Sequence, residues 1–489
     1  MTDQPQACYL GIDCGTQSTK ALLLDAAEGS TVAVRSTAHA LDSRSDGTSE
    51  QHPEDWLMAL REAVRGVLDA AGATEILGIA VSGQQHGLVA LDAQDRVVRP
   101  AKLWNDTTTV AECDLLTDAL GGLDAALEAT GNRFLTGYTA PKVLWLRRHE
   151  PDAYRAAARF CLPHDFINLW LTGEFVTEPG DASGTAYLDV RERRYADAVL
   201  GAIDPDRDWT AALPPIRDSL SAIGALRPAA AEALGLPAGI PVAAGGGDNM
   251  CAALGVGAVT PGPVVMSLGT SGTAFGRSDG PAIDPRGEVS AFCDSARGWL
   301  PLACTLNCTG VVAWARGLAG AGAPNVDDAL AASPAGAGGL TLLPYLAGER
   351  TPDLPRASGA LVGLRTDHGA ADLVRAAVEG VTIGLAFALE ALARTGVRAE
   401  RLLLVGGGAN SDAWGQLTAD VTGLPVERPA SVEAAAAGAA AQARWVVGGV
   451  APARAPVGRA WEPRPDERLT AARDRHTTLR RLAGEDAWR

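Results

Sequence analysis

Two turns rich in glycine and threonine constrain the fold of this chain more than any other feature. The first is Gly11-Ile-Asp-Cys-Gly-Thr-Gln-Ser-Thr-Lys20, and the second is Ser267-Leu-Gly-Thr-Ser-Gly-Thr273. Each turn lies between two apolar runs, which predicts a strand, a tight turn and a second strand. Backbone N–H groups in such a turn form a concavity for phosphate oxygens, and Thr and Ser hydroxyls add donors. Neither turn has the Walker pattern or the dinucleotide-binding spacing, so the pair predicts a different phosphate clamp, held between two similar domains.

The length and the order of the predicted elements indicate two domains. A chain of 489 residues is too long for one hydrophobic core, and 47% hydrophobic residues supply a substantial interior. Residues 9–81 read as three strands, a helix and a strand, and residues 264–318 repeat three strands and a helix. We therefore predict an α/β protein with domains at residues 1–245 and 246–450. The remaining residues, 451–489, are expected to form a surface connection and a terminal helix.

Charge and cysteine content limit the classes of partner. The net charge of −16 argues against nucleic acid or an anionic membrane as a partner. The amino-terminal residues lack the apolar core of a signal peptide, and no stretch is expected to span a bilayer. The eight cysteines form no C-x-x-C pair, which favours buried free thiols. We expect a cytoplasmic protein, and the sequence is compatible with a homodimer.

Two aspartates follow predicted strands and carry the expected chemistry. Asp13 ends a buried strand beside the first turn, where a carboxylate can hold Mg²⁺ directly or through water; the alternative is a residue that caps turn amides. Asp248 follows the apolar run at 241–244 and three glycines. In phosphoryl transfer to an alcohol, such an aspartate accepts the hydroxyl proton. The alternative is a polar hinge, but a hinge would tolerate Ser or Asn equally well, so we favour catalysis.

Three further segments have the composition of ligand sites. The turn Gly83-Gln-Gln-His-Gly87 offers amides and an imidazole to a polyol, although a lone His is more often structural. Trp104-Asn-Asp106 combines an aromatic platform with polar groups, as many sugar pockets do. Gly406-Gly-Gly-Ala-Asn410 could lie against a base or ribose, but on this segment alone we favour the alternative, ordinary strand-to-helix turn chemistry. Glu379, within an apolar helical pattern, is expected either to be paired or to line a cleft.

Together these segments resemble the FGGY carbohydrate kinases, which belong to the actin-like ATPase superfamily. The resemblance covers residues 8–446 and includes two long motifs, Gly137-Tyr-Thr-Ala-Pro-Lys-Val-Leu-Trp-Leu146 and Gly359-Ala-Leu-Val-Gly-Leu364 with the helix that follows it. Within the family, the segments at 85–87, 104–106, 245–249 and 343–352 are similar to those of members that phosphorylate D-xylulose. Two positions depart from the pattern. Gln85 stands where some relatives have Met, and Asp294 stands where His is common.

The resemblance implies two actin-like ATPase (ribonuclease H-like) domains flanking a cleft for nucleotide and sugar. It implies ATP-dependent phosphorylation of D-xylulose at the 5-hydroxyl, with Mg²⁺. Asp248 would be the general base, and Asp13 the carboxylate associated with Mg²⁺. The sugar site would comprise Gln85, His86, Trp104, Asp106, Asp248 and Asn249. The ATP site would comprise Thr16, Gln17, Lys20, Gly269, Thr270, Gly310, Gly407, Ala409 and Asn410.

Two other functions remain open from the sequence. The same chemistry could serve another ketose or a polyol, such as ribulose or glycerol. A nucleotide-gated binding protein could use the same ATPase core without catalysis. Such a protein would need no sugar-facing set of Asp, His and Trp residues, and ketoses would not stimulate its consumption of ATP.

Overall fold

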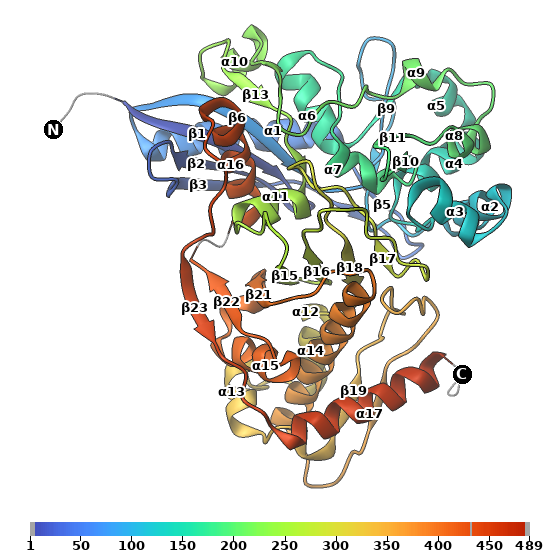
Figure 1. The fold of residues 1–489 in the computed structure, drawn as a ribbon, viewed down its shortest axis with the longest axis vertical. Helices are drawn as coiled ribbons and strands as arrows, with labels where there is room; N and C mark the ends of the chain where they lie inside the picture. The colour runs from blue at the N-terminus through green and yellow to red at the C-terminus, as the bar shows by residue number, and fades with distance from the viewer. Residues whose placement is uncertain (1–4, 431–432, 485–489) are drawn as a thin grey trace. The chain divides into compact units, whose positions relative to one another are not determined.

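The computed structural model describes residues 5–430 and 433–484 and divides the chain into two compact units. Unit 1 consists of Met1–Val259, Asp279–Leu300 and Glu433–Arg454, and unit 2 of Thr260–Ser278, Pro301–Val432 and Ala455–Arg489. Each unit contains a β-sheet flanked by helices (Figure 1). The boundary predicted after residue 245 lies within the first segment of unit 1. Residues 433–450, which were expected in the second domain, belong to unit 1.

The central sheet of unit 1 brings three strand ends together. Its strand order is β12-β13-β6-β1-β2-β3, and β14 also pairs with β6. Strand β1 runs parallel to β6, with Asp13 opposite Ser82, and Gly246 of β14 lies opposite the same serine from the other side. The strands concerned are β1 (Gln6–Cys14), β2 (Ser18–Asp25), β3 (Thr31–Ala38), β6 (Thr74–Gly83), β12 (Ala222–Ala225), β13 (Pro241–Ala243) and β14 (Gly246–Gly247). This register places the end of β1 next to the turn that precedes Asp248.

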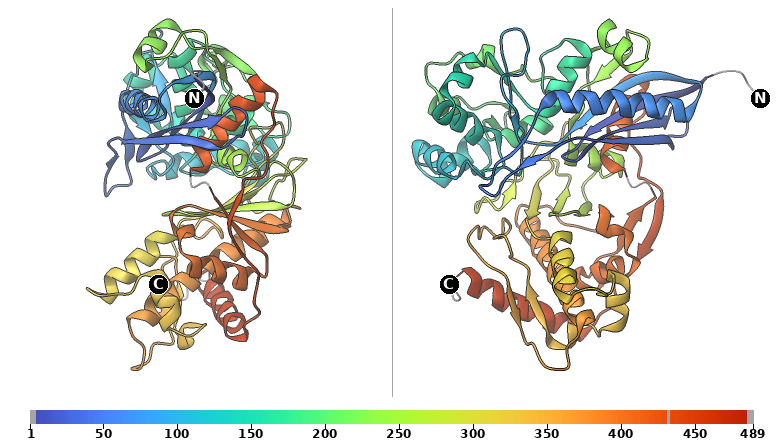
Figure 2. Two further views of the ribbon diagram at one scale, coloured as in Figure 1. Left: turned by 90° about the vertical axis from the view of Figure 1, so that its left-hand side faces the viewer. Right: turned by 180° about the vertical axis from the view of Figure 1, so that it is seen from behind.

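Alternating side chains of this sheet pack against two different helices. Leu10 and Ile12 face α1 (Pro53–Ala71), which is seen lying across the sheet from behind in Figure 2. Tyr9 and Leu22 instead pack against the alanines of α16 (Ala434–Gly448). A strand buried on both faces is expected to read as a continuous apolar run, as β1 and β2 do. The two apolar layers therefore fix the register of β1 and with it the position of Asp13.

The other elements of unit 1 surround this sheet (Figure 1). They are β4 (Asp42–Ser43), β5 (Ser49–Gln51), β7 (Val89–Leu91), β8 (Ala101–Lys102), α2 (Val110–Leu120), α3 (Leu123–Thr130), α4 (Thr139–His149), α5 (Pro151–Ala156), β9 (Arg159–Cys161), α6 (Pro163–Thr172), α7 (Pro179–Ala182), η1 (Ser183–Thr185), β10 (Leu188–Asp189), β11 (Arg194–Tyr195), α8 (Asp197–Ile203), α9 (Trp209–Ala212), α10 (Pro228–Leu234), α11 (Asp248–Gly255) and β17 (Val289–Ser290). Helix α11 begins at Asp248 and packs against α16.

Unit 2 has a second sheet, in which the strand order includes β18-β16-β15-β21-β22-β23. Its long helix α14 (Ala370–Arg394) packs against α12 (Thr309–Ala319), α13 (Val326–Ala332) and α15 (Asp412–Thr422). The strands are β15 (Pro263–Leu268), β16 (Gly272–Gly276), β18 (Leu302–Thr305), β19 (Thr341–Leu343), β20 (Ala360–Val362), β21 (Arg401–Val405), β22 (Val426–Pro429) and β23 (Val457–Trp461). The unit also contains η2 (Ala337–Gly339), η3 (Gly407–Asn410) and the terminal helix α17 (Glu467–Gly484).

Several predictions about buried groups and elements can be compared with this fold. The eight cysteines are free and buried, as expected. The surface connection expected within residues 451–489 contains a strand, because residues 457–461 form β23, which pairs with β22. By length and composition alone, α14 is long and apolar enough to be a candidate for a membrane span. However, 78% of its most apolar window is buried in the structure, as in the core helix of a soluble protein.

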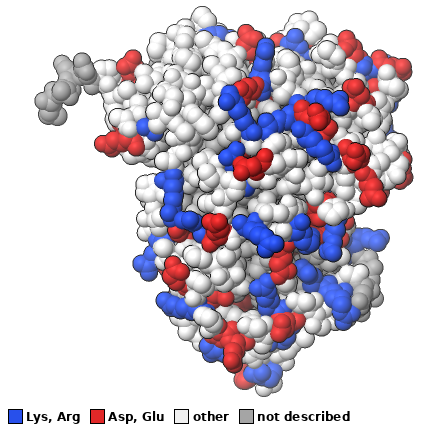
Figure 3. Space-filling view, in the orientation of Figure 1, with Lys and Arg blue, Asp and Glu red and all other residues white. Residues whose placement is uncertain are grey.

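Charged side chains of both signs are interspersed on the face shown in Figure 3.

Glu379 is paired, which was one of its two predicted states: it accepts hydrogen bonds from Arg375 at 2.7 Å and from the Gly336 amide at 2.9 Å. Asp294, whose role was not predicted, holds a turn by accepting hydrogen bonds from the amides of Ala296 and Gly298.

Candidate active site

Asp248 begins α11 immediately after the glycine turn and retains a partly exposed side chain. Its Oδ1 accepts hydrogen bonds from the Asn249 amide at 2.7 Å and from Asn249 Nδ2 at 2.9 Å. Burial of the group and the negative charge of Asp13 raise the pKa of Asp248 to about 7, against the opposing effect of the hydrogen bonds from Asn249. A carboxyl group with that pKa exchanges a proton readily near neutral pH.

Asp13 lies at the end of β1, where Ser82 Oγ donates a hydrogen bond to its Oδ1 at 2.8 Å. Burial raises the pKa of Asp13, while the positive charge of Lys20 and the hydrogen bond from Ser82 oppose that rise. Lys20 Nζ forms an ion pair with Glu433 at 2.6 Å. The turn after β1 therefore combines a carboxylate and a lysine within unit 1.

Gln85 links the turn at residues 83–87, predicted to bind the sugar, to Asn249, the residue after Asp248. Its Oε1 accepts a hydrogen bond from Asn249 Nδ2 at 2.9 Å. Its Nε2 is buried and has no hydrogen-bond partner among the described residues. An unsatisfied buried amide is costly, so it is a feature that a ligand oxygen would relieve.

His86 occupies the tight part of the same turn, with a positive φ of 68°. Its carbonyl oxygen accepts hydrogen bonds from Lys142 Nζ at 2.7 Å and Thr139 Oγ1 at 3.1 Å. Its ring lies against Tyr138 and Phe292, with centroid separations of 4.9 and 5.5 Å. These contacts fix the backbone and the ring of His86 beside Gln85.

Trp104 is tied to the first glycine turn by a chain of hydrogen bonds. Its Nε1 donates to Thr16 Oγ1 at 2.9 Å, and that hydroxyl donates to Gln84 Oε1 at 3.1 Å. Gln84 Nε2 donates in turn to Gln51 Oε1 at 2.9 Å. Thr16, predicted at the phosphates, is thus linked directly to Trp104, predicted at the sugar. Gln17, next in the chain, is exposed.

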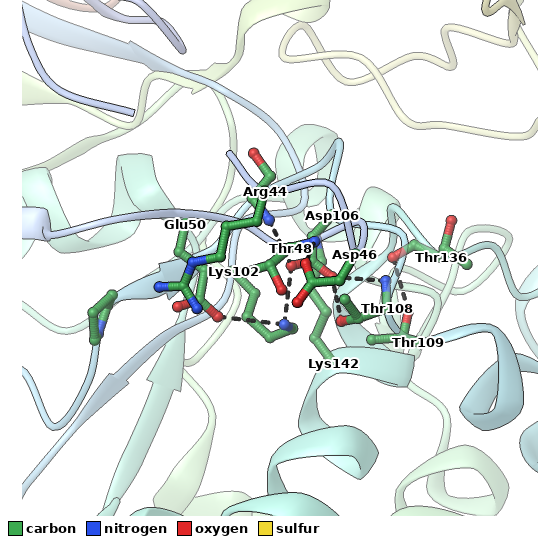
Figure 4. A network of polar contacts seen from close by, with 12 residues as sticks. Arg44, Asp46, Thr48, Glu50, Lys102, Asp106, Thr108, Thr109, Thr136 and Lys142 are labelled. Atoms are coloured by element: carbon green, nitrogen blue, oxygen red, sulfur yellow. Dashed lines mark hydrogen bonds and ion pairs between the residues drawn. The ribbon is translucent and has the colours of Figure 1, made fainter. Parts of the chain in front are cut away.

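Asp106 lies within a buried polar network (Figure 4). Its Oδ2 accepts hydrogen bonds from Lys102 Nζ and the Ser49 amide, both at 2.9 Å, and its Oδ1 accepts two from Thr108. Lys102 also contacts Glu50 at 3.3 Å. Protein groups therefore satisfy this carboxylate fully, which accounts for its burial without a ligand.

The predicted ATP-site residues from Gly269 onward belong to unit 2, whereas Thr16, Gln17 and Lys20 belong to unit 1. Thr309, at the start of α12, donates from its amide and its hydroxyl to the Gly269 carbonyl, at 3.0 and 2.7 Å, and Gly310 follows it. Thr270 and Gly310 are exposed. The short helix η3 also lies beside β15. In η3, Gly407 and Asn410 are exposed, whereas Ala409 is buried.

The sequence did not identify a cluster of buried ionisable groups that adjoins the Asp248 turn. His164 Nδ1 lies 2.9 Å from Asp181, and its Nε2 lies 3.1 Å from the Ala244 carbonyl. Although burial alone would lower it, the carboxylates of Asp165 and Asp181 raise the pKa of His164 to about 9. Gln442 of α16 also contacts this turn. The available signal was the presence of polar residues within apolar or alanine-rich helical patterns: His164, Asp165 and Asn168 in α6, and Gln442 in α16.

Comparisons with known proteins identify the family to which the chain belongs. Models of the FGGY family of carbohydrate kinases match the chain with their N-terminal domain over residues 8–255 and their C-terminal domain over residues 264–446. The xylulose kinase of Haemophilus influenzae is 39% identical and covers 90% of this chain and 91% of its own length. That of Streptomyces coelicolor is 42% identical, with coverages of 97% and 95%.

Solved structures give the same result. The crystal structure of xylulose kinase from Bifidobacterium adolescentis superposes with a TM-score of 0.83 at 32% identity, and covers 97% of this chain and 99% of its own. The predicted α/β fold class is therefore confirmed. The two family models match most of the described residues, and the relatives cover nearly the full length. The chain belongs to the FGGY family of carbohydrate kinases.

Proposed function

We propose that this protein transfers the γ-phosphoryl group of ATP to the 5-hydroxyl of D-xylulose, with Asp248 as the general base. The relatives named xylulose kinase support the substrate, at up to 42% identity over nearly the whole chain. The observation that carries the chemistry is the partly exposed carboxyl of Asp248, with a pKa raised to about 7. Because ATP is the phosphate donor, we place the reaction in the cytoplasm.

The hydrogen bonds of Asp248 support its role as a base. Asn249 occupies Oδ1, and none of the described residues donates a hydrogen bond to Oδ2. That oxygen is available to accept the proton of a sugar hydroxyl as the O–P bond forms. In a loose phosphoryl-transfer transition state, the orientation of this oxygen matters as much as its basicity.

Asp13 is the residue that we propose for Mg²⁺. The ion usually takes one or two protein carboxylates together with substrate phosphates, so a single carboxylate at the phosphate turn fits it. Asp13 retains an oxygen that is not used by the hydrogen bond from Ser82. The bound ion would neutralise charge on the phosphates. Lys20, held near Asp13 by its ion pair with Glu433, would add a second positive charge.

Sugar contacts are proposed for the polar groups beside Asp248. The unsatisfied Gln85 Nε2 supports a hydrogen bond to a sugar hydroxyl, and Asn249 holds the other end of that amide. His86 and Trp104 would complete the site, with Asp106 in the buried network behind it. For ATP, we retain the expected set: Thr16, Gln17, Lys20, Gly269, Thr270, Gly310, Gly407, Ala409 and Asn410.

The test is a coupled measurement of ADP release with ATP and a panel of acceptors: D-xylulose, D-ribulose, L-ribulose, glycerol and gluconate. We expect the highest kcat/KM with D-xylulose and phosphate at its 5-position in the product. A higher kcat/KM with another acceptor would assign the site to that substrate. ADP release that no acceptor stimulates would favour a nucleotide-gated binding protein.

A further inference from the structure

Gln442 makes four hydrogen bonds that the proposed chemistry does not use. Its Oε1 accepts a hydrogen bond from the Gly245 amide at 2.7 Å, and its Nε2 lies 2.9 Å from the Gly245 carbonyl oxygen. The same nitrogen lies 3.1 Å from the Ser219 carbonyl oxygen and 3.2 Å from that of Ser295. The side chain of Gln442 is fully buried. One amide thus joins three segments of unit 1 and satisfies both backbone polar groups of Gly245.

The position of Gln442 in α16 is unusual for that helix. Every other buried residue of α16 is Ala or Gly, because the helix packs closely on β1 and α11. At Gly438, for example, an added Cβ would lie 1.6 Å from the Cys251 carbonyl oxygen. A glutamine is larger and must bury a polar amide, which is costly unless every hydrogen bond is made. Packing alone therefore does not explain Gln442.

The turn that Gln442 contacts cannot use side chains of its own to hold its shape. Gly245 has a φ of 77°, and a Cβ there would lie 2.1 Å from the Val81 carbonyl oxygen. Gly246 and Gly247 follow, and Asp248 comes next. Three successive glycines leave the backbone free to vary in the absence of external contacts. The pairing of Gly246 and Gly247 with β6 and the side chains that bind Ala244 and Gly245 from outside the turn therefore set the position of Asp248.

A second set of contacts holds the residue before Gly245. The Ala244 carbonyl accepts a hydrogen bond from Asn168 Nδ2 at 2.9 Å, and His164 Nε2 lies 3.1 Å away. The carboxylates around His164 raise its pKa to about 9, so its ring carries a proton on both nitrogens at neutral pH and donates through Nε2. Helix α6 therefore fixes Ala244, whereas α16 fixes Gly245.

We propose that Gln442 is a positioning residue for Asp248: its amide holds the glycine turn so that the carboxylate of Asp248 meets the sugar hydroxyl. The inference rests on the proposed function, because it explains how Asp248 is oriented only if Asp248 is the general base. Gln442 reaches the site from a segment of unit 1, Glu433–Arg454, that lies between two segments of unit 2 in the sequence. The role is to orient a group that reacts, and Gln442 itself does not touch the substrate.

The first test compares Gln442→Met, which has similar length but no amide, with a control. The control is Thr418→Val in α15, which removes a buried hydrogen bond to the Trp414 carbonyl in unit 2. Because small misplacements of a reacting group are expensive, we expect kcat of Gln442→Met to fall by about 10- to 100-fold. The KM for ATP should change by less than about threefold, since uniform binding is retained. Thr418→Val should keep the kcat of the wild type.

The pH profile separates positioning from a loss of stability. Burial raises the pKa of Asp248, and so do the negative charges of Asp13 in β1 and Asp181 in α7. If the turn becomes mobile in Gln442→Met, Asp248 becomes more hydrated and its pKa should fall. The acidic limb of the kcat profile should then shift to lower pH. Wild-type kcat together with an unshifted limb would overturn the proposal.

Hydrogen exchange of the wild-type protein tests the contact without any variant, should Gln442→Met fail to fold. The amide of Gly245 donates to a buried side chain, so it should exchange slowly, as amides in the core strands do. Fast exchange of the Gly245 amide would show that its hydrogen bond to Gln442 does not persist in solution. Failure of the proposed function gives a different result: the wild-type protein would release no ADP with D-xylulose, whatever the protection of Gly245.

Discussion

At the scale of single residues, the ionisation of Asp248 sets the pH range of the reaction. A general base acts only when deprotonated, and burial together with Asp13 raises the pKa of Asp248 to about 7. We expect kcat/KM for the sugar to be constant above about pH 8 and to fall about tenfold per pH unit well below pH 7. Initial rates in overlapping buffers, with ATP saturating, measure the profile. A flat profile down to pH 5 would contradict the assignment.

The same raised pKa predicts that the ionised carboxylate of Asp248 destabilises the folded protein. For a carboxyl group whose pKa is higher in the folded state, the stabilising contribution is complete below its usual pKa near 3.8 and is lost as the pH rises through 7. Asp248→Asn should therefore raise the melting temperature at pH 8, and the gain should shrink toward pH 4. Asp69→Asn, at an exposed position of α1, is the control and should show no such trend. A melting temperature of Asp248→Asn at or below that of the wild type at pH 8 would be inconsistent with strain at Asp248.

At the scale of elements, α16 depends on small residues for its approach to α11. A Cβ at Gly438 would lie 1.6 Å from the Cys251 carbonyl oxygen, so Gly438→Ala forces the two helices apart. We expect the free energy of unfolding in urea to fall by roughly 1–3 kcal/mol, or by more if the backbone cannot move. Gly384→Ala is the matched control, because a Cβ there would meet nothing within 4 Å in α14.

The Gly384→Ala control is expected to change the free energy of unfolding in the opposite direction to Gly438→Ala. An alanine in an open helical position should stabilise by about 0.5–1 kcal/mol, since it restricts the unfolded chain. Equal effects of the two substitutions would mean that α16 and α11 do not pack as closely as the structure places them.

Elements with a strong local signal could be predicted from the sequence, and those without one could not. The three strands, the helix and the following strand predicted within residues 9–81 are present as β1, β2, β3, α1 and β6, and the first strand predicted after residue 264 corresponds to β15. Strand β23 was missed because four of its five residues are exposed and Pro and Arg surround it. Its pairing with β22 depends on a partner about thirty residues earlier in the chain, which no local pattern reveals.

At the scale of the whole molecule, the compact units do not follow the order of the sequence. Residues 433–450 lie between two segments of unit 2 in the sequence, yet α16 packs on β1, β6 and α11 of unit 1. The alanine-rich pattern predicts a helix but not the surface that it covers. For the same reason, Asp13 and Asp248 could be found from their place after strands, whereas Gln442 could not be connected to Gly245 before the fold was known.

A truncation tests this dependence of unit 1 on α16. A chain that ends at residue 432 exposes the apolar side chains of Tyr9, Leu22 and Leu24 on one face of the sheet. We expect it to aggregate or to lose cooperative unfolding, as followed by circular dichroism and size-exclusion chromatography. A chain that ends at residue 462 retains α16 and β23 and serves as the control for removal of α17. A soluble, cooperatively unfolding chain without α16 would refute the dependence.

The most direct measurement for the central proposal is the turnover of Asp248→Asn with D-xylulose and ATP. Asparagine keeps the size of the side chain but cannot accept the hydroxyl proton. We predict a fall in kcat of about 10²- to 10⁴-fold, with the dissociation constant for ADP, from calorimetry, unchanged within about twofold. Turnover at the wild-type rate would contradict the proposal that Asp248 is the base.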